Sequence, residues 1–269
     1  MKPLVSVIMN CHNGERFLKE AIESVYKQTY SNWEIIFWDN ASSDNSAKVA
    51  YSFDDKIKYF FAPNKTSLGE ARNLAVSKSS AKYLAFLDVD DVYFPTKIEK
   101  QIQLMEGKNY VMSYGSGLTI DENGDEINRK TVKNKSGYVF DSLLKNYEIG
   151  MQSVMILRSF LVEKKLEFDT SFFYCPDYNL FMLIAAQKPV AIIEDFIVKD
   201  RVVKTSLQYS NKSKEIAGHE IRVSLDNIVN RFPNLSKKYS KEFIQAYGKS
   251  RYYDAVGLIY KKNFKEARK

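Results

Sequence analysis

The chain has 269 residues, of which 45% are hydrophobic and 27% are charged. These proportions are typical of a globular protein and exclude a disordered or fibrous chain, and the length allows one large α/β domain with an extension. The formal net charge of +7 favours phosphate groups or an anionic membrane surface as partners, with a basic protein lacking such partners as the alternative. Nucleic acid is not expected, because the lysines are spread along the chain without a recognition module.

The apolar start at residues 4–10 predicts a first core strand rather than a signal peptide, because it ends in polar residues without a small-residue cleavage site. No run of about 18 apolar residues indicates a transmembrane helix. The two cysteines, Cys11 and Cys175, fall in different predicted elements and suggest neither a zinc site nor a disulfide framework. We therefore expect a cytoplasmic protein, with peripheral binding at the inner face of the membrane as a further expectation.

Short apolar runs alternate with helical patterns over the first 110 residues. The runs predict strands at 4–10, 33–38, 57–61 and 83–87, and the patterns predict helices at 16–27, after Asp44, at 68–77 and at 96–105. This alternation indicates an α/β fold with a mostly parallel central sheet flanked by helices. Ligands of such sheets bind beyond the carboxyl ends of the strands, which here are followed by the loops at 11–15, 39–45 and 88–93.

The pattern changes beyond residue 110. Segments 117–120 and 126–129 flank the hairpin signal Asn123-Gly124, and a strand at 152–157 and an amphipathic helix at 177–187 follow. From residue 212 the chain is rich in lysine and predicted to be helical, at 215–231, 237–247 and 251–260. We expect a ligand-binding domain over residues 1–210 and a helical C-terminal region over residues 211–269.

Three carboxylates, Asp88, Asp90 and Asp91, directly follow the apolar run at 83–87. Carboxylates gathered at a strand end repel one another unless a cation neutralises them. Mg²⁺ and Mn²⁺ prefer such oxygen ligands and keep positions open for phosphate oxygens. The run therefore indicates a divalent metal site that also binds a diphosphate, with a solvated acidic loop as the alternative.

Polar residues also follow the first two predicted strands. Asp39 and Asn40 each offer an acceptor for the N3–H of a pyrimidine base, whereas Asp44 is better explained as a helix N-cap. Asn10 and His12 lie in the turn after the first strand, where His12 is a candidate phosphate or base contact.

Two further residues lie near predicted helix starts. Arg72 is placed to face an anion near the start of the helix at 68–77, or to pair with a carboxylate. Asp177 begins the later amphipathic helix, where an acidic residue usually acts as a cap or a dipole partner.

Five segments, taken in order, resemble the motifs of family 2 glycosyltransferases with the GT-A fold. The segments are VSVIMNCHNGE at 5–15, SVYKQTY at 24–30, EIIFWDNASSD at 34–44, GEARN at 69–73 and FLDVDD at 86–91. The resemblance is strong over residues 4–105 and moderate to about residue 207. It implies an inverting enzyme that uses a nucleoside diphosphate sugar and Mn²⁺ or Mg²⁺. By analogy, its acceptor is a glycan or a lipid-linked molecule in bacterial surface polysaccharide, lipopolysaccharide or glycoconjugate synthesis.

The resemblance also assigns roles to individual residues. A general base at Asp177 is implied, and Asp90 and Asp91 are the predicted metal residues, with Asp90 as the direct ligand. The predicted nucleotide contacts are Asn10, His12, Asp39, Asn40, Arg72 and Asp88. Asp177 would accept the proton of the acceptor hydroxyl as that oxygen attacks the anomeric carbon.

The sequence departs from the family pattern at three positions. Asn40 stands where a second aspartate is usual, Pro176 where an acid is common, and Val203 where a histidine is frequent. Arg201 and Lys204 are the expected substitutes for that histidine as phosphate contacts.

These departures keep a second hypothesis open, a catalytically silent module that binds a nucleotide sugar. A dinucleotide-dependent fold is disfavoured, because the turn at 11–15 lacks the glycine-rich fingerprint. The lysine-rich helices with tyrosine and phenylalanine near the C-terminus predict contact with anionic lipid, against the alternative of a solvated helical appendage.

Overall fold

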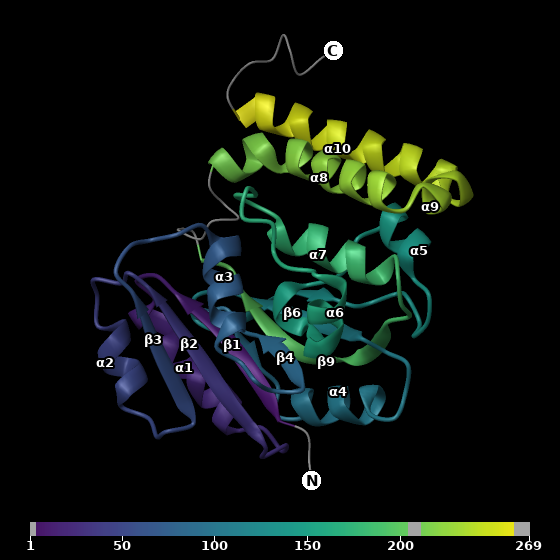
Figure 1. Ribbon diagram of the computed structural model, residues 1–269. Helices are drawn as coiled ribbons and strands as arrows, with labels where there is room; N and C mark the ends of the chain where they lie inside the picture. Colours follow the sequence, from purple (N-terminus) through teal and green to yellow (C-terminus); the bar gives the residue numbers. More distant parts are fainter. Residues whose placement is uncertain (1–3, 204–210, 261–269) are drawn as a thin grey trace.

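The computed structural model describes residues 4–203 and 211–260 (Figure 1). Its strands are β1 (Val5–Cys11), β2 (Trp33–Asn40), β3 (Ile57–Ala62), β4 (Tyr83–Phe86), β5 (Val92–Tyr93), β6 (Met112–Ile120), β7 (Glu126–Lys130), β8 (Met155–Leu157) and β9 (Ala191–Arg201). Within these residues the strands form one nine-stranded sheet in the order β3-β2-β1-β4-β8-β6-β9-β5, with β7 paired to β6. All the strands except β5, β7 and β8 run in one direction, so the predicted mostly parallel sheet is confirmed.

Helices cover both faces of this sheet. They are α1 (Glu15–Tyr26), α2 (Ser46–Tyr51), α3 (Leu68–Ser77), α4 (Lys97–Met105), α5 (Phe140–Lys145), α6 (Arg158–Lys164), α7 (Pro176–Ala185), α8 (Asn211–Arg231), α9 (Pro233–Lys238) and α10 (Ser240–Tyr260), with a 3₁₀ turn, η1, at Met151–Ser153. Successive side chains of a strand point to opposite faces, so β1 divides its residues between two cores. Ile8 packs into the core under α3 and α7, and Val7 packs into the core under α1 and α4.

The parallel pairing brings the ends of the first strands to one edge of the sheet. Cys11 is in register with Asp39 across β1 and β2, and Ile8 is in register with Phe86 across β1 and β4. The turns after β1, β2 and β4 therefore lie together, as the sequence predicted.

The structure differs from the prediction most clearly at β9, which the sequence analysis did not identify. Glu194 and Asp195 interrupt its apolar pattern, and both are exposed at an irregularity where the register between β6 and β9 shifts. The strand predicted at 152–157 is shorter, because η1 occupies its first residues. The helices predicted at 237–247 and 251–260 are joined in one helix, α10, from Ser240 onward, whereas residues 237 and 238 end α9. The hairpin at Asn123-Gly124 is confirmed.

The C-terminal helices pack on the α7 side of the molecule, where α8 lies between α7 and α10 (Figure 1). Leu225 and Phe243 belong to the same buried cluster as Phe181 of α7, so α8 and α10 share the core of the preceding domain. A division at residue 210 remains a prediction. Within the described residues, none of the helices combines the length and apolar character needed to span a bilayer.

Candidate functional site

Hydrogen bonds join the turn after β1 to the turn after β2. The backbone N–H of Asn13 donates to Ser42 Oγ (3.0 Å), and that of Glu15 donates to Asp44 Oδ2 (3.0 Å). Asp44 Oδ1 also accepts from the N–H of Ser46 (3.0 Å), so its carboxylate caps the starts of α1 and α2. The N-cap assignment predicted for Asp44 is wrong by one residue, because Asn45 is the N-cap of α2 and Asp44 supports the helix start from the position before it.

Asp39 is buried, with 1% of its surface exposed, at the end of β2. Its Oδ1 accepts the N–H of Ser42 (2.7 Å), and its Oδ2 accepts the hydroxyl of Tyr59 (2.7 Å). Burial, together with this bond to a carboxylate, raises the pKa of Tyr59. Asp39 is therefore fixed in position, and a contact to a nucleotide base would use the remaining lone pairs of its oxygens.

Asn40 holds the backbone of Thr66 through both halves of its amide. Its Nδ2 donates to the carbonyl of Thr66 (3.1 Å), and its Oδ1 accepts the N–H of the same residue (3.1 Å). An aspartate has no donor for the carbonyl, which gives a structural reason for asparagine here. The base contact predicted for Asn40 would compete with this pair of bonds.

Asn10 and His12 complete the first turn. The side-chain nitrogen of Asn10 is buried without a hydrogen-bond partner among the described residues, which is uncommon for a buried amide. His12 is exposed, and its Nδ1 donates to the backbone carbonyl of Asn40 (3.0 Å). Both residues lie at the carboxyl edge, as predicted.

Arg72 pairs with the first carboxylate of the acidic run. Ser67 Oγ accepts the N–H of Glu70 (3.3 Å) and so fixes the start of α3, the helix that carries Arg72. The guanidinium lies 3.3 Å from Asp88 Oδ1, and its side chain is only 5% exposed, against 38% for that of Asp88. Of the two alternatives left open by the sequence, the structure shows pairing with a carboxylate.

Asp177 lies within the electrostatic reach of this pair, although α7 is distant in sequence. Burial raises the pKa of the Asp177 carboxyl, while Arg72 opposes the rise and Asp88 adds to it. Pro176 occupies the first turn of α7, which places Asp177 at the start of that helix. The fold thus brings Asp88, from the loop after β4, together with Arg72 of α3 and Asp177 of α7.

Asp90 is a strongly perturbed carboxyl. Burial and the adjacent Asp88 carboxylate raise the pKa of Asp90 to about 6, with a further rise from Asp200 and an opposing effect of Arg201. A cation beside Asp90 would relieve this repulsion, so this one carboxyl is suited to a divalent metal. In the parts of the chain that the structure describes, no three His, Cys, Asp or Glu side chains are arranged as a metal site. An ion there would therefore need oxygen ligands from another molecule, such as a diphosphate.

Asp91 has a different environment from the one predicted for a metal ligand. It is 3% exposed, its Oδ1 accepts the N–H of Arg201 (2.7 Å), and its Oδ2 accepts Gln152 Nε2 (2.5 Å). To bind a metal, Asp91 would have to give up bonds that hold the acidic loop to β9.

Arg201 is buried and cannot replace the absent histidine as a phosphate contact. Its guanidinium donates to the backbone carbonyls of Asp90 (2.9 Å) and Asp121 (3.1 Å) and to Glu20 Oε2 (2.6 Å), and its side chain is 2% exposed. Arg201 therefore supports the acidic loop through the backbone carbonyl of Asp90. The phosphate-binding role expected for Arg201 was wrong. Lys204 lies outside the described residues, and Val203 is buried.

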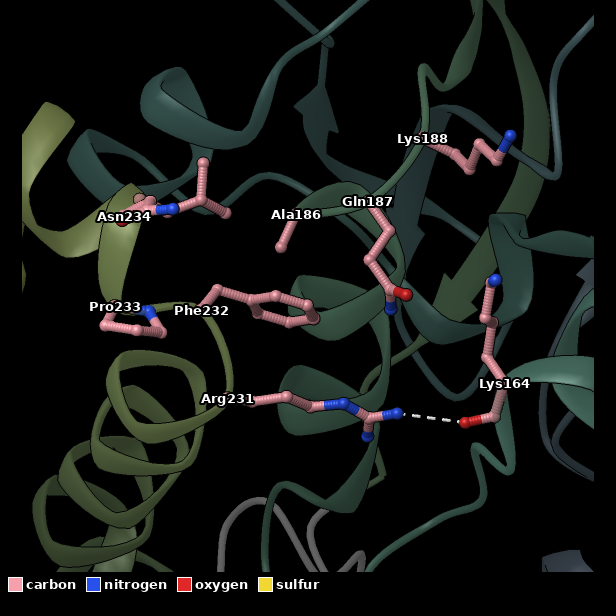
Figure 2. A pocket seen from close by; sticks show the side chains of 9 residues that line it. Lys164, Ala186, Gln187, Lys188, Arg231, Phe232, Pro233 and Asn234 are labelled. Atoms are coloured by element: carbon pink, nitrogen blue, oxygen red, sulfur yellow. Dashed lines mark hydrogen bonds between the residues drawn. The ribbon is translucent and has the colours of Figure 1, made fainter.

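Two cavities lie outside this group of residues. One, of about 460 Å³, is lined by Lys164, Lys188, Arg231 and Phe232 near the C-terminal ends of α7 and α8, where Arg231 donates to the carbonyl of Lys164 (Figure 2). The other, of about 360 Å³, lies between α3 and α6 and includes Asn73. Neither is lined by a predicted site residue.

Sequence reasoning did not identify several residues that support the site. Tyr59, Thr66 and Gln152 are polar residues within predicted strands or loops, and no local pattern connects them to their partners. Gln152 donates both to Asp91 and to Asp200 Oδ1 (2.7 Å), so it joins η1 to β9 as well as to the acidic loop. Only the fold reveals such contacts, because the partners are far apart in sequence.

Comparisons with known proteins identify the family of the chain. The family model described as glycosyl transferase family 2 matches residues 6–176. The chain is 34% identical, over 79% of its length and 82% of the relative's, to the UDP-Glc:alpha-D-GlcNAc-diphosphoundecaprenol beta-1,3-glucosyltransferase of Escherichia coli. It is 32% identical, over 74% of its length and 64% of the relative's, to an uncharacterized glycosyltransferase of Rickettsia typhi.

Solved structures share the fold at low sequence identity. Residues 1–349 of S. aureus TarS, in complex with UDP-GlcNAc, superpose with a TM-score of 0.74 at 14% identity, covering 98% of this chain and 89% of that one. The mannosyltransferase PcManGT of Pyrobaculum calidifontis, in complex with GDP-Man and Mn²⁺, gives a TM-score of 0.70 at 14% identity, covering 97% and 74%.

Proposed function

This chain belongs to glycosyl transferase family 2 and has the GT-A fold, and on that premise we propose that it moves a sugar, with inversion, from a nucleoside diphosphate sugar to a hydroxyl acceptor. The main support is the convergence of Asp88, Arg72 and Asp177 at the carboxyl edge of the sheet. In open α/β sheets this edge is where ligands bind.

In the proposed mechanism Asp177 is the general base. Its carboxylate accepts the proton of the acceptor hydroxyl while that oxygen forms a bond to the anomeric carbon. The bond between that carbon and the diphosphate oxygen breaks, and its electron pair leaves with the diphosphate. Burial raises the pKa of Asp177, which makes its carboxylate a stronger base than an exposed one.

Asp90 is the residue to which we assign a divalent cation, Mn²⁺ or Mg²⁺. When bound, the cation would neutralise charge on the leaving diphosphate. Asp88 holds Arg72 in place, and Asp91 anchors the loop through Gln152 and the N–H of Arg201. This assignment keeps the predicted metal role for Asp90 and gives Asp91 a supporting one.

For the donor, we propose that the nucleotide lies over the turns that carry Asn10, His12, Asp39 and Asn40. The support is their shared edge and the unpartnered amide nitrogen of Asn10. The names of two similar proteins motivate the substrate classes: TarS was solved with UDP-GlcNAc, and the E. coli relative acts on a lipid-linked GlcNAc diphosphate. For this chain we propose a donor that contains uridine or a related nucleoside. We propose a glycan or a lipid-linked molecule as the acceptor, in the synthesis of a bacterial surface glycan.

A lipid-linked acceptor would require contact with a membrane. We propose that α10 supplies it at the cytoplasmic face, because Ile244 is 72% exposed and Tyr252 is 67% exposed on its outer side. Lys241 and Arg251 are exposed on the same helix and would attract anionic lipid.

The donor can be selected by thermal shift with a panel of nucleoside diphosphate sugars, each with and without Mn²⁺. A true donor should raise Tm through binding to the folded state, and more so with the metal present. Product analysis with that donor should then show transfer, and Asp177→Asn should lower kcat by on the order of 10²- to 10⁴-fold while nucleotide affinity stays the same. Tight binding without transfer to any acceptor would favour a silent binding module instead.

A further inference from the structure

The backbone that leads into α7 is held by a carboxylate from the C-terminal region. Glu220 of α8 accepts the N–H of Phe173 at its Oε1 (2.7 Å) and the N–H groups of Tyr174 and Cys175 at its Oε2 (2.9 Å each). The Cys175 thiol is a fourth, weaker donor to this carboxylate and contacts Oε2 (3.5 Å). Three successive peptide groups are thus fixed by one side chain that is 6% exposed.

These peptide groups immediately precede Asp177. Cys175 is the N-cap of α7, yet its own side chain makes no capping bond, and Pro176 has no N–H to offer. Glu220 therefore brings a negative charge from a distant helix to the N-terminus of α7 and binds the N–H of its N-cap residue. Any displacement of Glu220 would be transmitted to the start of α7 and hence to the Asp177 side chain.

The helix that carries Glu220 is itself firmly seated. Leu225 and Ile228 of α8 are fully buried in the core shared with α7. Asn227 Nδ2 contacts Asn179 Oδ1 (3.5 Å), a second polar link between the two helices. A carboxylate on such a helix can set a backbone position to within a fraction of an ångström, because buried packing resists small shifts.

We propose that Glu220 is a positioning residue of the transfer reaction, so that the C-terminal helices are part of the catalytic apparatus rather than an appendage. The inference rests on the proposed role of Asp177 as the general base. Glu220 does not touch the reacting atoms; it fixes the peptide groups from which Asp177 extends.

Glu220→Gln is the most direct test, because it preserves shape and replaces one acceptor oxygen with a donor. The new NH₂ group would face at least one of the peptide N–H groups that the carboxylate now accepts. We expect kcat at saturating donor to fall roughly 10- to 100-fold, since small misplacements of a catalytic group have effects of this order. The KM for the donor and calorimetric affinity for the nucleoside diphosphate should stay at wild-type values.

The matched control is Asp226→Asn, which removes a carboxylate two turns along the same helix. Asp226 Oδ1 accepts the hydroxyl of Tyr247 (2.5 Å) and has no contact with the loop before α7. We expect this variant to keep wild-type kcat even if its Tm falls. The stoichiometry of nucleotide binding gives the concentration of folded sites. Each kcat is calculated with that concentration and so refers to folded enzyme only.

A second variant covers the case in which Glu220→Gln fails to fold. Glu220→Asp keeps the charge and both oxygens but is one methylene shorter, and it should give a kcat between those of Glu220→Gln and the wild type. If Glu220→Gln folds and keeps the wild-type kcat, the inference is overturned. If only Glu220→Asp folds, a wild-type kcat in that variant overturns it. If Asp177→Asn also kept full turnover, the assignment of the base would fail as well, so the two failures can be told apart.

Discussion

Two asparagines hold peptide groups on either side of the candidate site. Asn40 binds the N–H and carbonyl of Thr66, and Asn73 binds those of Phe168 through its Oδ1 (2.9 Å) and Nδ2 (2.8 Å). The sequence marked Asn40 as a departure from the family pattern without a reason for it. The structure supplies one, because a carboxylate at this position would face the Thr66 carbonyl without a proton to donate.

The first prediction follows from this pairing. Asn40→Asp should lower the free energy of unfolding by about 1–3 kcal/mol, the usual cost of leaving a buried polar group unpaired. Urea denaturation measures the effect, and Asn128→Asp, at an exposed position of β7, is the control and should change little. If Asn40→Asp kept full stability and bound the donor more tightly, position 40 would be a base contact rather than a support.

Lys97 gives a prediction about pH. Its amine is fully buried in α4, bonded to Gln101 Oε1 (2.7 Å) and 4.2 Å from the centre of the Tyr93 ring, and burial lowers its pKa well below the usual range. Between the folded-state pKa and the unfolded-state pKa, the unfolded chain binds more protons. Stability should therefore rise with pH across that window and decrease as pH falls through it.

Lys97→Met should remove this dependence and raise stability near neutral pH, because it removes the cost of burying an amine. Urea denaturation at a series of pH values from 7 to 10 measures the slope. Lys100→Met, on the partly exposed side of the same helix, is the matched control. An unchanged slope in Lys97→Met would contradict the assignment.

At the scale of elements, the turn after β1 is packed directly against the acidic loop. A Cβ added at Gly14 would lie 2.7 Å from Val89 Cγ2 and 3.0 Å from the sulfur of Cys11. Since Val89 separates Asp88 from Asp90, the size of residue 14 limits where these carboxylates can lie.

Gly14→Ala should therefore displace the acidic loop, lower stability by about 1–3 kcal/mol and weaken metal-dependent nucleotide binding. Calorimetry and urea denaturation measure the two effects. Gly248→Ala is the control, because a Cβ there would meet no atom within 4 Å, and alanine should stabilise α10 by about 0.5–1 kcal/mol. Wild-type nucleotide binding in Gly14→Ala would show that the loop does not depend on this contact.

The sequence predicted the strands and helices near the site, but it did not predict the hydrogen bonds that join these elements to one another. β1, β2 and β4 were found because buried parallel strands are nearly continuous apolar runs, and β3, a partly exposed edge strand, was found by its apolar residues at 57–61. β9 was not, because Glu194 and Asp195 interrupt its apolar pattern at an irregularity. The contacts of Gln152, Arg201 and Glu220 join segments distant in sequence, so no local pattern contains them. The assignments of Asp90 as a metal ligand and Asp177 as the base remain predictions.

At the scale of the whole molecule, α10 is the outermost helix on the α7 side (Figure 1). The chain should sediment with vesicles rich in anionic phospholipid at low salt and not with neutral ones. Replacing Ile244 and Tyr252 with serine should reduce the bound fraction, whereas Ile127→Ser, at a 56% exposed position of β7, should not. Equal sedimentation with neutral and anionic vesicles, or none with either, would count against a membrane role for this face.

The proposed function depends most on the binding of a cation, together with a diphosphate, by the carboxylates after β4. Calorimetric titration of nucleoside diphosphates, with Mn²⁺ and with a chelator, tests it in the wild type and in Asp90→Asn. We expect the wild type to bind at least one nucleotide tightly with Mn²⁺, and we expect the chelator and the substitution to cause the same large loss of affinity. Equal affinity under all these conditions would contradict it.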